Sequence, residues 1–194
     1  MAPRQYSLKS RAAAAQETRQ RIVQATLQLH TEKGVVATSH KDIAARADVS
    51  VGTVYHHFPT RDAVVSACGA HVLELFPPRP VEAIDARAPR RRRIASLARE
   101  LVALYVRMPW WEKLRAERQE VPALDVGMAM REEATRKLIR AALGRLTNAK
   151  RTAVVEAVAD PAVINHLLES GMSQNEAAST LASILNAWLE GGRS

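Results

Sequence analysis

Apolar residues recur along this chain at the three- and four-residue spacing that is typical of amphipathic helices. Residues that end or begin helices interrupt the pattern at Gly34, Pro77–Pro80, Pro109, Pro122 and Asp160-Pro161. Glycine favours the end of a helix, and proline favours its first turn or the loop beyond its end. No stretch alternates apolar and polar residues for long enough to suggest a sheet, so the pattern predicts an all-α fold of about nine to ten helices.

The stretch TSHKDIAARADVSVGTVYHHFPTR, residues 38–61, is typical of two short helices joined by a tight turn. The apolar face of the first helix consists of Ile43, Ala44 and Ala47. Asp48 stands at the turn, and aspartate is one of the few residues besides glycine that tolerate a left-handed backbone. Ser50 can cap the second helix, where the small residues Gly52 and Thr53 allow a close approach to DNA and its phosphates. The motif predicts a helix-turn-helix and therefore a DNA partner.

The motif also resembles the tetracycline-repressor (TetR) family of bacterial regulators. The matching residues are Asp42-Ile43-Ala44, Ala47-Asp48-Val49-Ser50, Gly52-Thr53-Val54-Tyr55-His56-His57-Phe58 and the basic Arg61, preceded by a helix from Glu17 to Gly34. Three residues depart from the family pattern. Asp48 replaces the usual turn glycine, Val51 stands where a basic or polar residue is common, and His30 occupies a slot usually held by an aromatic core residue.

The resemblance covers about a quarter of the chain and implies a two-part helical architecture. The expected parts are a basic flexible arm over residues 1–16, a three-helix DNA-binding domain over 17–62, and a helical effector-binding and dimerisation domain over 63–194. In the family, an effector in the second part changes the distance between the two helices that read the DNA.

Candidate DNA contacts come from the motif and from the basic N-terminal segment. In the motif they are Thr38, Ser39, Lys41, Ser50, Val51, Gly52, Thr53, Tyr55, His56 and Arg61; in the segment they are Arg4, Lys9 and Arg11. Thr53 and His56 lie on one helical face and are expected to contact base edges or phosphates. Tyr55 and Arg61 are expected to contact phosphates. The alternative for Thr38 and Ser39 is helix capping alone, and for Arg61 a solvated charge.

The effector pocket that the resemblance implies is expected around the break at Pro109. Its candidate lining is Leu101, Leu104, Tyr105, Met108, Trp110, Trp111 and Met128, with Asn165 and His166 as polar partners. Such a mixture of apolar and aromatic groups with a few polar tips suits a small apolar or aromatic molecule. The alternative is that these residues are ordinary core.

The last two expected helices carry apolar stripes that suit a dimer interface. The candidates are Ile164, Leu167, Leu168, Leu181, Ile184, Leu185 and Trp188. Ala178, Ala182 and Leu189 widen the apolar arc of the last helix beyond the needs of one neighbour. Two such helices from each chain, packed about a two-fold axis, would form a four-helix bundle.

Composition narrows the function further. The chain has 194 residues and a formal net charge of +8, which suits a polyanion partner, although a membrane surface would also fit. Its single cysteine, Cys68, excludes an intramolecular disulfide, and its first residues lack the apolar core of a secretion signal, so we expect a cytoplasmic protein. No apolar run approaches the ~20 residues that span a bilayer.

Metal and catalytic sites are not expected. Cys68 and His71 share a helical face, but two ligands do not make a metal site. No glycine-rich phosphate loop, nucleophile elbow or HExxH motif occurs, so we expect no cofactor and no enzyme activity. The arginine run Arg90–Arg93 is interpreted as a solvated helix end, because the resemblance places it away from the DNA.

These observations predict a homodimeric repressor that binds a palindromic operator and is released from it by a small molecule. Two alternatives remain open: a DNA-binding regulator without a small-molecule effector, and an enzyme that uses the C-terminal pocket.

Overall fold

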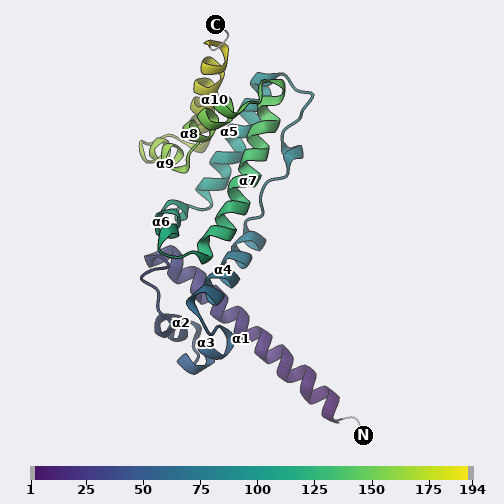
Figure 1. Ribbon diagram of the computed structural model, residues 1–194, viewed down its shortest axis with the longest axis vertical. Helices are drawn as coiled ribbons and strands as arrows, with labels where there is room; N and C mark the ends of the chain where they lie inside the picture. The colour runs from purple at the N-terminus through teal and green to yellow at the C-terminus, as the bar shows by residue number, and fades with distance from the viewer. Residues whose placement is uncertain (1–2, 192–194) are drawn as a thin grey trace. The chain divides into compact units, whose positions relative to one another are not determined.

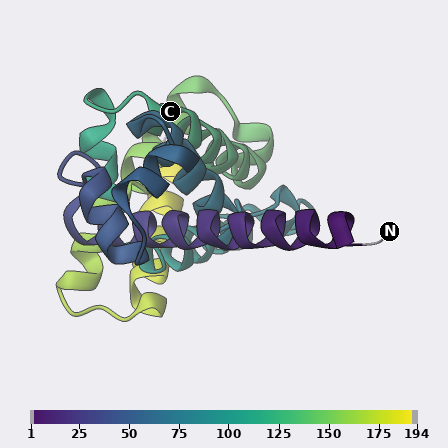
Figure 2. The same cartoon turned by 90° about the horizontal axis from the view of Figure 1, so that it is seen from below.

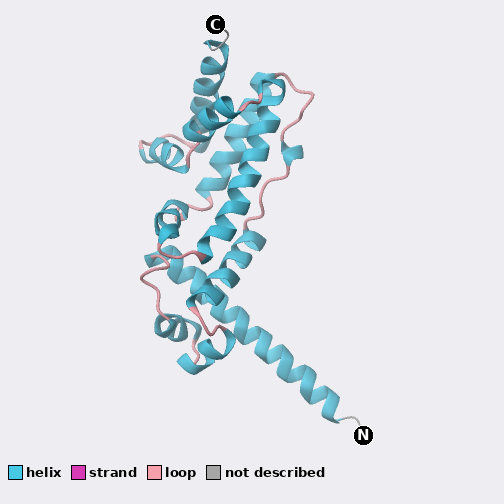
Figure 3. Ribbon diagram, in the orientation of Figure 1, coloured by secondary structure: helices cyan, strands magenta, loops and turns pink. Residues whose placement is uncertain are grey.

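The computed structural model describes residues 3–191, which form ten α-helices and three short 3-10 helices, with no strand in that range (Figure 1 and Figure 3). The α-helices are α1 (Pro3–Lys33), α2 (His40–Ala47), α3 (Val51–His57), α4 (Arg61–Leu75), α5 (Arg90–Val106), α6 (Trp111–Ala116), α7 (Ala123–Leu143), α8 (Ala149–Val158), α9 (Pro161–Glu169) and α10 (Gln174–Gly191). The 3-10 helices are η1 (Val81–Ala83), η2 (Glu117–Gln119) and η3 (Gly144–Leu146). The prediction of an all-α fold is confirmed. None of the described helices is both long and apolar enough to cross a membrane.

The chain divides into two compact units, and each is built from two separate segments. Unit 1 contains the residues up to Leu75 together with Lys113–Gly127. Unit 2 contains Phe76–Glu112 and the residues from Met128 onward. Unit 1 therefore includes a segment that lies far along the chain from the helix-turn-helix.

In unit 1, α1 packs against α2 and α4, and α2 packs against α3. The core of these four helices consists of Ile22, Val23, Ala25, Leu29, Ile43, Ala44, Ala47, Val54, Phe58 and Val64. Fully burying one of the larger side chains contributes roughly 1.5–3 kcal/mol to folding. This packing gives α3 a fixed inner face, so the residues on its other face are held at the surface.

Helix α1 is longer than the sequence predicts. Residues 1–16 are expected as a flexible arm, whereas α1 runs as one continuous helix from Pro3 (Figure 2). No glycine or proline interrupts the chain between Pro3 and Gly34, and the run Ala12–Ala15 has the highest helix propensity. The side chains of Arg4 and Lys9 lie outside the described residues, and Arg11 is exposed.

The loop between α1 and α2 is held by residues from the later segment of unit 1. The Glu117 carboxylate accepts hydrogen bonds from the backbone N–H groups of Val35 (2.5 Å) and Val36 (3.2 Å). Lys113 Nζ donates to the carbonyl oxygen of Glu32 (2.9 Å). A side chain at Gly34, whose φ is +92°, would strike the Glu117 carboxylate. The glycine is therefore required both by its backbone conformation and by this close approach.

In unit 2, α10 packs along α5, while α9 contacts both of these helices and α8 contacts α10. The largest fully buried side chains of this unit include Ile94, Leu97, Leu101, Ile139, Leu143, Ile164, Leu181 and Leu185. Two helices of this unit begin at capping residues that the sequence predicts. Asp160 caps α9, and Ser173 and Glu176 form the capping box at the start of α10.

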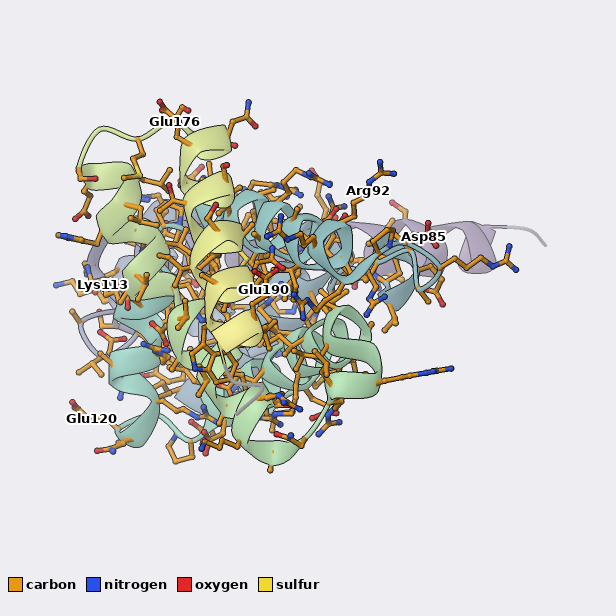
Figure 4. All side chains as sticks on the ribbon, turned by 90° about the horizontal axis from the view of Figure 1, so that it is seen from above. Asp85, Arg92, Lys113, Glu120, Glu176 and Glu190 are labelled. Carbon is orange, nitrogen blue, oxygen red and sulfur yellow. The ribbon has the colours of Figure 1, made fainter. Side chains whose placement is uncertain are left out.

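The arginine run at the start of α5 is only partly solvated, which corrects the interpretation from the sequence. Arg90 and Arg91 both pair with Glu190 of α10 (3.0 Å each), and Arg93 donates to the backbone carbonyl oxygen of Ala142 (3.0 Å). Arg91 is exposed as well as paired, and Arg92 points outward (Figure 4). Three of these guanidinium groups therefore join α5 to its neighbours, since they reach acceptors on α7 and α10.

Candidate nucleic-acid interface and candidate ligand site

The turn between α2 and α3 has the geometry of a helix-turn-helix. Ser39 and Asp42 form a capping box at the start of α2. Asp48 ends α2 in a left-handed conformation (φ 52°, ψ 55°), and Ser50 caps α3 by accepting a hydrogen bond from the backbone N–H of Thr53 (3.0 Å). These local contacts fix the direction in which α3 leaves the turn.

Tyr55 is the most prominent side chain on the outer face of α3, with 51% of its surface exposed. Its ring stacks on the ring of His40 with a centroid separation of 4.5 Å and an interplanar angle of 3°. His40 Nε2 in turn lies 3.2 Å from the carbonyl oxygen of Phe58, to which it donates. His40 therefore holds the Tyr55 ring in place. His40 was not among the candidates from the sequence, although its position next to the Ser39 cap was a possible signal.

The remaining candidate DNA contacts fall into two groups. Lys41, Val51, Gly52 and His56 are exposed, and Thr53 is half-buried with its hydroxyl 2.8 Å from that of Ser50. Together with Tyr55 they form one outer surface over α2 and α3. Thr53 and His56 lie three residues apart on α3, as the helical spacing predicts.

The second group, Thr38, Ser39 and Arg61, is engaged within unit 1. The Thr38 hydroxyl is buried and donates to the carbonyl oxygen of Gly34 (2.6 Å), and Ser39 belongs to the capping box. Arg61 Nη2 donates to the carbonyl oxygen of Val36 (2.7 Å). We therefore expect these three residues to shape the DNA-binding surface more than they contact DNA themselves.

Ion pairs join α1 to α2 below this surface. Arg46 binds Glu32 with two parallel contacts of 2.8 Å, and Lys33 pairs with Asp42 (2.9 Å). The hydrogen bond from Ser39 is the main cause that lowers the pKa of Asp42, followed by the contact with Lys33. Because all four side chains are substantially exposed, each pair contributes only modestly to stability.

In unit 2, the residues expected to line an effector pocket are mostly buried around the end of α5. Leu101, Tyr105, Met108, Trp111 and Met128 are buried, whereas Leu104 and Trp110 are half-buried. The cavity that touches this group is about 10 Å³ in volume, enough for about one water molecule. Its lining consists of Pro78, Arg79, Glu100, Leu101, Leu104, Arg131, Ala134, Thr135 and Leu138. Asn165, half-buried, and His166, exposed, lie on α9 outside this lining.

Arg131 is the residue of this region that sequence reasoning missed. Its exposed fraction is 2%, and it lies on α7 one helical turn before Thr135 and two turns before Leu138. The guanidinium lies over the Trp111 ring, 5.6 Å from its centroid, and Nη2 donates to the carbonyl oxygen of Phe76 (2.5 Å). A charged residue in a run such as MREEATRK is ordinarily solvated, so the sequence gives no signal for this burial.

The candidate dimer residues divide into core and surface. Ile164, Leu181 and Leu185 are buried within unit 2 itself, whereas Ile184 is 46% exposed. Leu167, Leu168 and Trp188 are half-buried. The exposed part of the stripe is therefore narrower than the sequence suggests, because α5 already covers much of the inner face of α10.

Cys68 is shielded from solvent in this arrangement. It is buried on α4, and burial raises the pKa of its thiol to about 12. A thiol with such a pKa stays protonated near neutral pH, so it is a poor nucleophile and a poor metal ligand.

The comparisons with known proteins agree with the geometry of unit 1. Residues 22–68 match the family described as bacterial regulatory proteins, tetR family. The chain is 30% identical over 96 residues to the HTH-type transcriptional regulator LuxR of Vibrio harveyi, covering 50% of this chain and 47% of LuxR. It is 40% identical over 78 residues to the HTH-type transcriptional repressor KstR of Mycolicibacterium smegmatis, covering 40% of this chain and 34% of KstR. The matches thus span less than half the length of these curated relatives.

The likeness to a solved structure extends over both units. The multidrug binding protein EbrR, in its crystal structure complexed with ethidium, aligns with 87% of this chain and 98% of its own at a TM-score of 0.59 and 27% identity. The family match lies on the helix-turn-helix described above, and the solved structure shares the helical architecture that follows it. The helix-turn-helix region of this chain, residues 22–68, is that of the tetR family of bacterial regulatory proteins.

Proposed function

We propose that this protein is a DNA-binding repressor of transcription that binds a palindromic operator as a homodimer. The observation that carries the proposal is the outer surface of α2 and α3, where Lys41, Tyr55 and His56 are exposed on a helix-turn-helix fixed by its caps. A helix presented in this way fits the major groove, in which its polar side chains can reach base edges while neighbouring cations neutralise phosphates. The names of the relatives, among them the repressor KstR, support the same role.

Recognition of a palindromic operator requires a dimer with two-fold symmetry. One short helix reads only a few base pairs, and a two-fold dimer doubles the site, with half-sites about 34–36 Å or somewhat more apart. The exposed Ile184 and half-buried Trp188 on α10, with Leu167 and Leu168 on α9, supply the apolar surface for a self-complementary contact.

We further propose that a small molecule bound in unit 2 releases the DNA. The solved structure of the multidrug binding protein EbrR is a complex with ethidium, and in this chain the aromatic side chains of Tyr105 and Trp111 gather near the end of α5. Because the cavity beside Leu101 and Leu104 holds only about one water molecule, a ligand at this place would have to favour a more open state of the unit. A ligand shifts such an equilibrium only by its difference in affinity for the two states.

The small cavity also favours a second candidate function. A regulator without a small-molecule effector would have a packed unit 2, and this is close to what α5 and α7 enclose. The two functions differ in one measurement: only the ligand-responsive repressor loses operator affinity when a compound is added.

The DNA-binding proposal is tested by selecting duplexes from a random pool and measuring affinity against salt. We expect an enriched palindrome and an affinity that falls steeply with salt, because bound cations release counterions from the duplex. Lys41→Ala should weaken binding to all sequences and lower the salt slope by about one. His56→Ala should change the preferred sequence, with a loss of about 1–3 kcal/mol at a contacted base.

Lys137→Ala is the matched control, because this exposed lysine lies on α7 in unit 2. It should leave both affinity and salt slope unchanged. A pool without an enriched motif, or an equal effect of the two lysine variants, would contradict the DNA-binding surface proposed here.

A further inference from the structure

Arg131 is a buried cation that has no ion-pair partner among the described residues of unit 2. Its Nη1 atom is buried and has no hydrogen-bond partner, and its Nη2 atom binds only the backbone carbonyl oxygen of Phe76. Among the described residues, no carboxylate forms an ion pair with it. Burial lowers the pKa of Arg131, but an arginine stays protonated near neutral pH. A buried charge without a partner lowers the stability of the folded state. An anion beside Arg131 would offset this loss, and the described residues do not supply one.

The other charged groups that line the cavity compensate one another. Glu100 forms an ion pair with Arg79 (2.6 Å), although its buried Oε2 atom accepts no well-aligned hydrogen bond. Arg131 is therefore the charged residue of the lining that has no ion-pair partner. The rest of the lining is mostly apolar, with Leu101 and Leu104 from α5 and Leu138 from α7. The cavity therefore combines one excess positive charge with apolar walls.

Two aromatic residues interact with the guanidinium of Arg131. Its Cζ atom lies over the Trp111 ring, and Tyr105 is close enough to interact electrostatically with it. Both rings are buried. Phe76, whose carbonyl oxygen holds Nη2, packs its own ring edge-on against Trp110, with 6.2 Å between centroids. These contacts hold the guanidinium in one orientation, so Nη1 is preorganised to donate.

We propose that unit 2 binds a small organic acid, with its carboxylate on Nη1 of Arg131 and its apolar or aromatic body among Leu101, Leu104, Tyr105 and Trp111. This inference rests on the proposed ligand response and names the chemical class of the ligand. The carboxylate supplies the missing partner through a charge-assisted hydrogen bond. A neutral amide of the same shape can accept a hydrogen bond from Nη1 but leaves the positive charge uncompensated, and a cationic amine adds a second buried positive charge. The site thus selects by charge as well as by shape.

The test compares ligands that differ only in their charged group. The probes are decanoate, 4-phenylbutyrate and 2-naphthoate. Each is compared with the amide and the amine that have the same hydrocarbon body, and all are added to the full-length protein. Binding is followed by tryptophan fluorescence, because Trp110 and Trp111 lie beside the site, and by calorimetry. We expect at least one carboxylate to bind about tenfold or more tightly than its amide, and the amines to bind most weakly.

Variants on α7 test whether the preference for a carboxylate over its amide depends on Arg131. Arg131→Met retains the length and apolar stem of the side chain, and it should bring the affinities of the carboxylate and its amide to within about twofold of each other. Lys137→Met, an exposed position on the same helix, should retain the full preference. If Arg131→Met does not fold, the comparison of acid with amide in the wild-type protein decides alone, and Arg131→Lys, which keeps the charge but loses the planar fork, should show a reduced preference.

Operator binding is measured with every probe, so that the two proposals can fail separately. If no carboxylate binds more tightly than its amide, or Arg131→Met keeps the preference, the assignment of an acid ligand is overturned. If an amide or amine releases DNA in that case, the ligand response itself still stands. If carboxylates bind through Arg131 and the operator stays bound, the acid site stands and the proposed ligand response is overturned.

Discussion

Both units bury a basic side chain, but the consequences differ because the two side chains differ in acidity. His30 in unit 1 is 3% exposed, and burial, assisted by the charge of Arg61, lowers its pKa from 6.5 to about 4. It is therefore neutral at neutral pH and fits the core as an uncharged ring. Arg131 in unit 2 is equally buried but remains charged. Burial of a basic residue is thus compatible with a structural role in unit 1, whereas in unit 2 it leaves a charge that needs an anion.

The largest expected effect comes from placing a new charge inside unit 2. Leu185 is 0% exposed where α10 packs along α5. A carboxylate at this position would be removed from water and would have no cation or hydrogen-bond donor placed to pair with it. We expect Leu185→Asp to lower the free energy of unfolding by more than about 4 kcal/mol, measured by urea denaturation. A tolerated Leu185→Asp would show that this interior accepts charge freely, and burial of Arg131 would then not indicate a need for an anion.

The neighbouring Ile184 provides the matched control and a test of the dimer. Because it is 46% exposed within one chain, Ile184→Asp should leave the fold nearly unchanged. If α10 forms the dimer contact, sedimentation of this variant should show monomers, and operator affinity should fall with the loss of the second half-site. A stable dimer in Ile184→Asp would exclude this face of α10 as the interface.

The next effect is a dependence of stability on pH that His30 confers on unit 1. Between about pH 6.5 and pH 4 the unfolded chain binds a proton at this residue and the folded chain does not, so stability falls as the pH falls through this window. A difference of this size corresponds to about 3 kcal/mol at pH 4. Denaturation of the wild-type protein at pH 7 and at pH 4.5 measures the loss.

His30→Gln should remove most of this pH dependence, because glutamine does not titrate. His56→Gln is the control, since His56 is exposed on α3 and should retain the slope of the wild-type protein. Equal slopes in the wild type and in His30→Gln would mean that His30 is not held neutral, and the contrast with Arg131 would disappear.

The smallest effect concerns the charge of Arg131 itself. Replacement of a buried, incompletely paired charge by an apolar side chain of similar volume is often neutral or stabilising. We expect Arg131→Met to raise the free energy of unfolding in the absence of ligand by roughly 1 kcal/mol. The gain should vanish when the wild-type protein is saturated with a bound carboxylate, because the ligand then stabilises the folded state. A loss of several kcal/mol would instead identify Arg131 as a structural residue held by Phe76 and Trp111.

The sequence by itself determined the elements that depend on near neighbours. The Ser39–Asp42 capping box, the left-handed Asp48 and the Ser50 cap each involve residues within three or four positions of one another. Their conformations follow from side-chain chemistry and backbone sterics, and the helix-turn-helix could be predicted from them. The same holds for the start of α10 at Ser173 and Glu176.

Only the tertiary structure decided which side chains are buried and what they contact across the chain. Glu117 holds the backbone of Val35, some eighty positions earlier, and no local pattern marks either residue for this contact. Leu185 and Ile184 are neighbours on one expected interface stripe, yet one is core and the other surface. Arg131 reads as a solvated helix residue until α5, α6 and the chain at Phe76 enclose it. Burial depends on the packing of segments that are distant in sequence, and it is burial that turns an ordinary arginine into a candidate ligand site.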